Sequence, residues 1–352
     1  MVVNNMKIVI RSLTFDKVKD KYDYLLKEID NLPENEKEII LDFRFLRWAE
    51  PTAMIYFGYQ FRKIIEGREG IVVSIIEGTG KNSGYYGWMG LFKYFVPHAT
   101  EGQNTGHVKG NNTYIPITNI NVKEEYGKSF LRGEYFERGD YIIGRASQLA
   151  RIVTDHSELQ EILKYIIREI IRNVPEHSSK DDLWICGQAW PSSSYSRAQI
   201  VIMDEGIGVH RSLTANLFHQ RENATNLDSL RSAIRPGISK AFRRGSENSD
   251  TDRWSNSGFG LYVVSELCKK LKGRFLLISG DNYVYTGGDI EEIECGLNHL
   301  DGTLVAIELP LQHTDIDSTA LLNSIIDAGE KIAAYDRVSI SKASFPSRNI
   351  NF

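Results

Sequence analysis

Three short segments in the second half of the chain combine residue types that could hold a nucleotide and a metal ion. The first is Glu169-Ile-Ile-Arg-Asn173, where a carboxylate and an amide are four residues apart. In a helix, that spacing places both side chains on one face. A carboxylate can accept a proton from an attacking water, and an amide oxygen suits Mg²⁺, which takes hard oxygen ligands. A solvated Glu and Asn on a surface helix would fit the same spacing.

The second segment is a short apolar run, 200–203, which ends in Asp204 and is followed by Gly206 and Gly208. This pattern predicts a strand that runs into a tight turn. An aspartate at the strand end can accept a hydrogen bond from an exocyclic amine such as that of adenine, and the glycines would let the base approach the backbone. An ordinary glycine turn is the alternative.

The third segment, 257–261, contains Gly258, Gly260 and Leu261 and precedes a run at 262–271 with apolar residues at helical spacing. Backbone N–H groups at a helix start, freed of side-chain bulk by glycine, form an anion site that suits phosphates. A glycine-rich loop before a helix would look the same.

A predicted helix at 163–174 positions the first segment. Its apolar residues recur at helical spacing and are Ile166, Ile167, Ile170, Ile171 and Val174. Pro175 removes a helical donor, so we expect the helix to end near Val174. His177 therefore cannot be assumed to share the face of Glu169.

The order and context of these segments resemble the GHKL ATP-binding fold of histidine kinases, gyrase-type ATPases, Hsp90 and the anti-sigma-factor serine kinases. Gly302-Thr303, before an apolar run at 304–309, resembles the late Gly-Thr strand of that family. The resemblance covers roughly 145–312. It implies an α/β sandwich that binds ATP and Mg²⁺.

The resemblance also implies a role for each matching residue. Glu169 would be the water-activating base, Asn173 the Mg²⁺ ligand and Asp204 the adenine contact. The remaining residues would contact the nucleotide: Gly206 and Gly208 along the base, Gly258, Gly260 and Leu261 at the phosphates, and Thr303 at adenine through water.

The segment 209–257 is where the family carries a mobile lid. We expect one of its cations to neutralise the γ-phosphate, although the sequence does not single one out. The candidates are Arg231, Arg235, Lys240, Arg243, Arg244 and Arg253.

Length and composition argue against several classes of function, among them nucleic-acid binding and membrane insertion. The chain has 352 residues, enough for two domains, and its 42 basic and 46 acidic residues give a net charge of −4. This charge supplies no general attraction to nucleic acid or an anionic membrane. The three cysteines are scattered, and no apolar run approaches the length of a membrane span, so we expect a cytoplasmic protein and not a transmembrane sensor kinase.

The first hundred residues alternate strand-like and helix-like runs, which predicts a second α/β domain. The segment 39–54 resembles the STAS domain of anti-sigma-factor antagonists, and 87–92 resembles the start of that fold's last helix. STAS domains are often phosphorylated on a serine after the loop acid, but Pro51 follows Glu50 here. We therefore expect an unphosphorylated docking or dimer surface, in which Trp48 and Met54 are structural.

We expect four segments: a STAS-like domain at 1–100, a connecting segment at 101–144, a GHKL domain at 145–312 and a helical tail at 313–352. Such a fusion predicts a slow ATPase that acts as a nucleotide-gated regulatory switch with a protein partner. Two alternatives stay open: a serine-type protein kinase of the anti-sigma-factor class, and a non-catalytic ATP-binding scaffold. A homodimer is an expectation by analogy.

Overall fold

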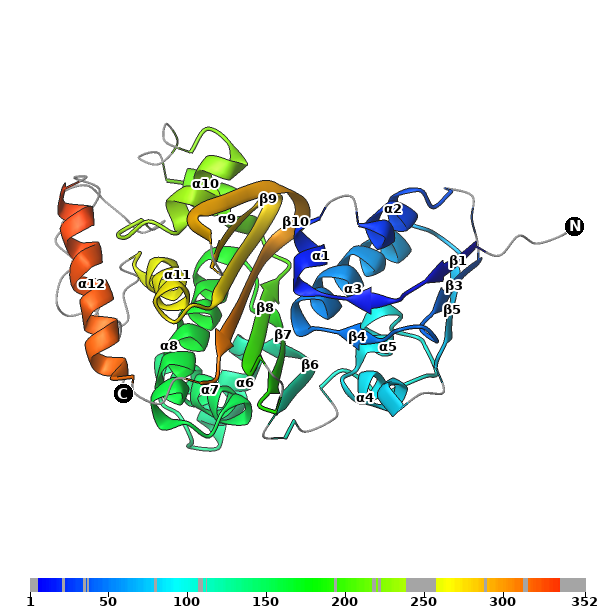
Figure 1. Cartoon of the computed structure of the whole chain (residues 1–352), viewed down its shortest axis with the longest axis horizontal. Helices are drawn as coiled ribbons and strands as arrows, with labels where there is room; N and C mark the ends of the chain where they lie inside the picture. The colour runs from blue at the N-terminus through cyan, green and yellow to red at the C-terminus, as the bar shows by residue number, and fades with distance from the viewer. Residues whose placement is uncertain are drawn as a thin grey trace, which may run out of the picture. The chain divides into compact units, whose positions relative to one another are not determined.

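The computed structural model of the chain has the mixed α/β architecture that the sequence predicts (Figure 1). It describes residues 6–20, 23–33, 36, 38–78, 81–106, 110–111, 113–192, 195–216, 220, 223–238, 258–287, 290–312 and 316–335. The chain divides into two compact units. The first comprises 1–119 with 184–188 and 199–201, and the second comprises 120–183, 189–198 and 202–352.

The first unit contains a three-stranded parallel sheet in the order β1-β3-β5, formed by Met6–Val9, Glu38–Asp42 and Val72–Ile76. Two further short strands pair in parallel, β2 (Ser12–Leu13) with β4 (Trp48–Ala49). The helices of this unit are α1 (Phe15–Lys19), α2 (Tyr24–Asp30), α3 (Pro51–Glu66), α4 (Lys81–Trp88) and α5 (Leu91–Phe95). The alternation of strands and helices expected for this region is therefore confirmed. A helix start lies within 87–92 as expected, because α4 ends at Trp88 and α5 begins at Leu91.

The loop before α3 corrects one expectation and confirms another. Met54 is fully buried, as expected, but Trp48 is 40% exposed, and its indole Nε1 donates a hydrogen bond to Glu50. Thr52 is fully buried, and its backbone N and its Oγ1 both donate to the Oε1 atom of Gln199, at 2.9 and 2.8 Å.

A second sheet has five strands in the order β6-β7-β8-β10-β9, of which β9 and β10 belong wholly to the second unit. Its strands are Tyr114–Asn121, Asp182–Trp190, Arg197–Asp204, Ile290–Pro310 and Arg274–Gly287 in that spatial order. Pro116 has no N–H for a ladder, which is consistent with the place of its strand β6 at the sheet edge. β9 and β10 are antiparallel.

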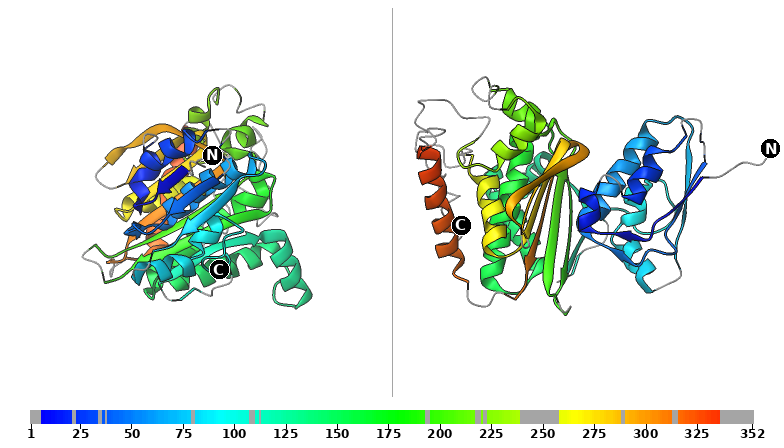
Figure 2. Two further views of the ribbon diagram at one scale, coloured as in Figure 1. Left: turned by 90° about the vertical axis from the view of Figure 1, so that its right-hand side faces the viewer. Right: turned by 45° about the horizontal axis from the view of Figure 1, so that its top comes forward.

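Helices α8 (Ser157–Asn173) and α11 (Gly260–Lys270) lie along one face of this sheet (Figures 1 and 2). The helix α7 (Arg138–Val153) packs on α8 and follows α6 (Val122–Leu131). Two shorter helices, α9 (Gly208–Thr214) and α10 (Asn226–Ala233), contact β9. Cys186 and Cys268 are both buried.

The helix α12 (Ser318–Tyr335) contacts α8 and α11, so the tail region expected to be helical packs on the body of the second unit (Figure 2). Leu322, Ile325 and Ile326 are buried there. Ile332 is 43% exposed and does not belong to the packed face.

Candidate nucleotide-binding pocket

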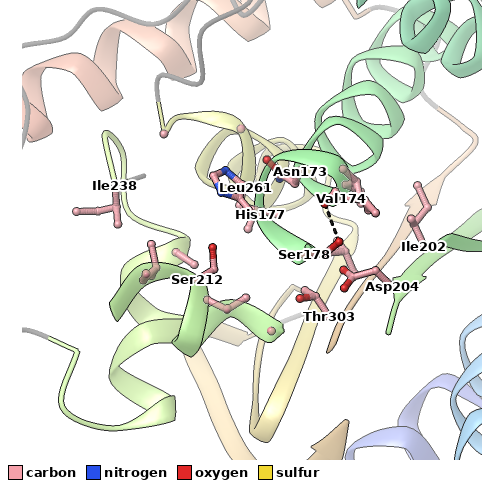
Figure 3. Close-up of a pocket in the computed structure, with 18 residues that line it drawn as sticks. Asn173, Val174, His177, Ser178, Ile202, Asp204, Ser212, Ile238, Leu261 and Thr303 are labelled. Carbon is pink, nitrogen blue, oxygen red and sulfur yellow. Dashed lines mark hydrogen bonds between the residues drawn. The ribbon is translucent and has the colours of Figure 1, made fainter. Parts of the chain in front are cut away.

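A pocket in the second unit gathers most of the residues that the sequence singled out (Figure 3). Its lining combines apolar side chains with a few polar groups and three glycines. The lining residues are Ile170, Asn173, Val174, His177, Ser178, Ile202, Asp204, Gly208, Val209, Ser212, Leu213, Ala233, Ile238, Gly258, Gly260, Leu261, Thr303 and Val305. Such a mixture is typical of ligand sites, in which apolar walls bury a ligand and a few polar groups orient it.

The end of α8 supplies one side of the pocket. The α-helix ends at Asn173, close to the predicted position, and one π-helical turn, Val174–Ser178, follows it. The hydroxyl of Ser178 donates to the carbonyl oxygen of Val174 at 2.7 Å and secures this turn. The wider turn brings His177 into the pocket with Asn173. A π-helical turn of this kind often marks a functional site.

Asp204 ends the almost continuously buried strand β8 and is itself only 5% exposed. Burial raises the pKa of its carboxyl group to about 7, although hydrogen bonds from the backbone N–H of Gly206 and the side chain of Thr303 oppose that rise. The Gly206 bond is 2.8 Å long. In Figure 3, Asp204 and Thr303 lie together, apart from Asn173 and His177. The pocket therefore has two separate polar ends.

The glycine turn after β8 is held by Ser279, a residue that no local sequence pattern marks. The hydroxyl of Ser279 accepts from the N–H of Val209 at 2.9 Å and donates to the carbonyl oxygen of Gly302 at 2.5 Å. Gly208 has φ +76°, and a β-carbon there would lie 2.8 Å from the Ser279 oxygen. Gly206 does not line the pocket, but its backbone holds the carboxylate of Asp204.

At the start of α11, the backbone of Gly258 and of Gly260 lies so close to neighbouring atoms that there is no room for a side chain. A β-carbon on Gly258, which has φ +75°, would lie 2.6 Å from the carbonyl oxygen of Ile238. Gly260 and Leu261 open the helix beside the pocket. The first N–H groups of a helix have no partner within it, so this end of the pocket suits an anion.

Glu169 does not line the pocket. Its carboxylate is fully buried and accepts hydrogen bonds from Arg168 at 2.7 and 3.1 Å and from Arg172 at 2.8 Å. Burial pushes the pKa of this carboxyl group upward, but the charges of Arg172 and Arg168 outweigh burial and hold the pKa below its ordinary value. The side chain is close to the pocket all the same, since a β-carbon on Gly260 would lie 2.7 Å from its Oε2 atom.

The pocket offers a hard oxygen ligand to a magnesium ion in the side chain of half-buried Asn173. Among the described residues, no cluster of three or more His, Cys, Asp or Glu side chains could hold a metal ion by itself. A single amide ligand fits Mg²⁺ bound together with nucleotide phosphates and water, because this ion commonly keeps few protein ligands.

Two of the candidate lid cations, Arg231 and Arg235, are exposed and do not line the pocket. The other four lie outside the described residues: Lys240, Arg243, Arg244 and Arg253. The sequence interpretation missed Arg168 and Arg172 as partners of Glu169. Their signal was available, because two arginines flank this glutamate inside an apolar helix.

Residues 158–313 match the family model described as Histidine kinase-, DNA gyrase B-, and HSP90-like ATPase. No curated protein and no solved structure matches the chain. No helix in the described part of the chain is long and apolar enough to cross a membrane. The matched residues contain α8, the glycine turn after β8, the start of α11 and the Gly302-Thr303 pair. Residues 158–313 are therefore similar to the histidine kinase-, DNA gyrase B- and HSP90-like ATPases, and this similarity supports a nucleotide-binding domain of that kind in this part of the chain.

Proposed function

We propose that the second unit binds ATP with Mg²⁺ in the pocket and hydrolyses it slowly, so that the chain works as a nucleotide-gated regulatory switch. The observation that carries this proposal is the pairing of buried Asp204 at one end of the pocket with Asn173 at the other. The two ends match the two parts of the ligand. An aspartate accepts from the adenine amine, and an amide oxygen ligates the metal that the phosphates share.

In this proposal, Asp204 orients adenine together with Thr303, and Gly206 and Gly208 give the base access to the backbone. Gly258, Gly260 and Leu261 hold the phosphates at the start of α11. Asn173 holds Mg²⁺, which would neutralise phosphate charge when bound. Glu169 accepts the proton of the attacking water.

Calorimetry with ATP and GTP tests the binding step. Guanine carries an acceptor where adenine carries its amine, so GTP cannot make the buried hydrogen bond to Asp204. We therefore expect a clear preference for ATP, of about 1–3 kcal/mol in binding free energy. Equal affinity for the two nucleotides would overturn the role of Asp204. Asn173→Ala should abolish the Mg²⁺-dependent part of the affinity and leave the ATP preference over GTP in place.

A non-catalytic ATP-binding scaffold is the second candidate, and one observation favours it. The carboxylate of Glu169 is already paired with two guanidinium groups, which makes it a weaker base. Bound ATP that stays intact over hours with Mg²⁺ present would establish the scaffold. A serine-type protein kinase would instead transfer phosphate, so the mass of a protein partner would increase after incubation with ATP.

We further propose that the first unit is an unphosphorylated STAS-like docking or dimer surface. Buried Thr52 supports this proposal, because its backbone N–H and its hydroxyl both already donate to Gln199. Co-purification of the chain with a protein partner, or a second copy of itself, would test it.

A further inference from the structure

A second cavity of about 250 Å³ lies beside α7, α8 and the π-helical turn. It shares no lining residue with the nucleotide pocket. Three arginines face it, with one acidic residue and three uncharged ones. The lining residues are Arg138, Gly139, Ile142, Arg168, Arg172, Pro175 and Glu176. The surplus of positive charge makes this cavity attractive to an anion.

Arg172 shows that the cavity is more than a charged surface. Its side chain is buried, and its Nη2 atom donates to Glu169. Its Nη1 atom has no hydrogen-bond partner among the described residues. Its Nε atom lies 3.7 Å from Glu176, beyond hydrogen-bond length. A buried guanidinium with unused donors is costly, and an oxyanion in the cavity would satisfy them.

The other lining groups suit a phosphate group. Arg138 is exposed and leaves the cavity open to solvent at the start of α7. Gly139 lies in the first turn of this helix, where backbone N–H groups have no partner within the helix. Arginine binds phosphate oxygens through paired N–H groups, and the volume suits one phosphate group with a few waters better than a whole nucleotide. Glu176 opposes binding and sets a limit on affinity.

We propose that this cavity binds a phosphate group, which competes with Glu169 for Arg172 and thereby activates hydrolysis. The same guanidinium borders the cavity and holds the Oε2 atom of Glu169 at 2.8 Å. When it turns toward the anion, the carboxylate beside Gly260 loses part of its charge pairing and becomes a stronger base. The activation step rests on the proposed function, whereas the binding step does not.

Binding is tested by titrating the full chain with inorganic phosphate at constant ionic strength. A non-hydrolysable ATP analogue with Mg²⁺ is present at saturation, so that the nucleotide pocket is filled. Arg138→Gln removes one cavity arginine that makes no contact with Glu169. This variant should weaken the affinity for phosphate about tenfold, as expected for the loss of one charge-assisted hydrogen bond. Arg151→Gln is the matched control, because Arg151 is an exposed residue of the same helix outside the cavity. Equal weakening in both variants, or none in Arg138→Gln, overturns the site.

Phosphoserine in place of inorganic phosphate separates the two sources of the group. Tighter binding of phosphoserine would point to a phosphorylated partner, and tighter binding of inorganic phosphate to the free ion. Either result supports the site, provided that Arg138→Gln weakens the binding of the ligand.

Turnover then tests the coupling. Phosphate should raise ATP hydrolysis at least about fivefold in the native chain and in Arg151→Gln, but not in Arg138→Gln. Product inhibition in the nucleotide pocket would lower turnover equally in all three. If phosphate binds without raising turnover, the proposed coupling is overturned, while the proposed phosphate site still stands. A chain without turnover in any condition refutes both hydrolysis and coupling, while the titration still decides whether the cavity binds phosphate.

Discussion

The Oε2 atom of Glu169 lies 2.7 Å from the point where a β-carbon on Gly260 would stand. A real β-carbon does not approach an oxygen that closely, so the buried carboxylate and the first residue of α11 fit together only because residue 260 is glycine. The relationship joins the proposed base to the proposed phosphate end of the pocket. It also explains why a motif glycine is needed at the helix start for a reason other than flexibility.

Gly260→Ala should therefore impair the domain at this contact. Overpacking of a closed site costs about 1–3 kcal/mol, which we expect as a loss in the free energy of unfolding in urea. ATP affinity should also fall, because the start of α11 must shift. Gly127→Ala is the matched control, since a β-carbon on that helical glycine of α6 meets no atom within 4 Å. It should leave stability unchanged or raise it slightly. A Gly260→Ala variant as stable as native would contradict the packing argument.

Glu169→Gln should separate catalysis from binding. The amide keeps the size of the side chain but cannot accept the water proton, so we expect hydrolysis to fall by about 100- to 10,000-fold while ATP affinity changes little. Both variants remove the counter-charge of Arg168 and Arg172, but Glu169→Ala also removes every oxygen that accepts their hydrogen bonds. It is therefore the poorer test and should cost about 3–5 kcal/mol of stability.

Turnover of Glu169→Gln is measured beside its unfolding free energy, so that loss of folding is not mistaken for loss of chemistry. Near-native turnover in a folded variant would remove Glu169 as the base. That result would indicate that other groups of the pocket activate the attacking water.

Thr52→Glu tests whether the first turn of α3 can accept negative charge. Thr52 is fully buried, so a carboxylate there would be placed in an apolar interior without a counter-charge. We expect a loss of several kcal/mol, against about 1 kcal/mol for Thr52→Val, which loses only the hydroxyl. The measurement is the unfolding free energy of both variants.

Peptide mass spectrometry on protein from its native host gives the direct answer for this residue. We expect no phosphate on Thr52. Stoichiometric phosphate would mean that the start of α3 opens in the cell, and it would revive the phospho-switch that Pro51 argues against.

The sequence predicted the elements that carry the pocket because each has a strong local signal. The apolar stripe of α8, the buried run of β8 and the glycines before α11 determine structure through neighbours in the chain. The consequences of Pro175 were only half predictable: the α-helix ends where expected, but the π-helical turn depends on the bond from Ser178 to Val174.

Other features of the site depend on residues far apart in sequence. Ser279 supports the turn at Gly208 from 71 positions away, and no local pattern marks it. The sequence does show two arginines close to Glu169 in an apolar helix, but their burial, which makes them fixed partners of the carboxylate, is seen only in the fold. Exposure of Trp48 was mispredicted for the same reason, since aromatic residues in short loops are buried or exposed according to distant contacts.

Asp204 should make both stability and adenine binding depend on pH near neutrality. The pKa of its buried carboxyl group is raised from 3.8 to about 7, so the folded state holds a proton that the unfolded chain releases from about pH 4 upward. Between these values the unfolded chain binds fewer protons, and stability therefore falls as pH rises, by at most about 1.4 kcal/mol per pH unit. In Asp204→Asn, this fall should disappear from urea unfolding curves.

Adenine binding should show the opposite trend. Only the ionised carboxylate accepts from the adenine amine with its full charge, so affinity should rise as pH increases through about 7, with release of a proton on binding below that pH. Adenosine is the suitable ligand, because it has no phosphate that titrates in this range. Calorimetry at pH 6 in two buffers of different ionisation enthalpy measures the released proton, and Asp204→Asn should release none. An affinity for adenosine that stays level from pH 5.5 to 8 in the native chain would show that Asp204 is not the adenine contact, whatever its pKa.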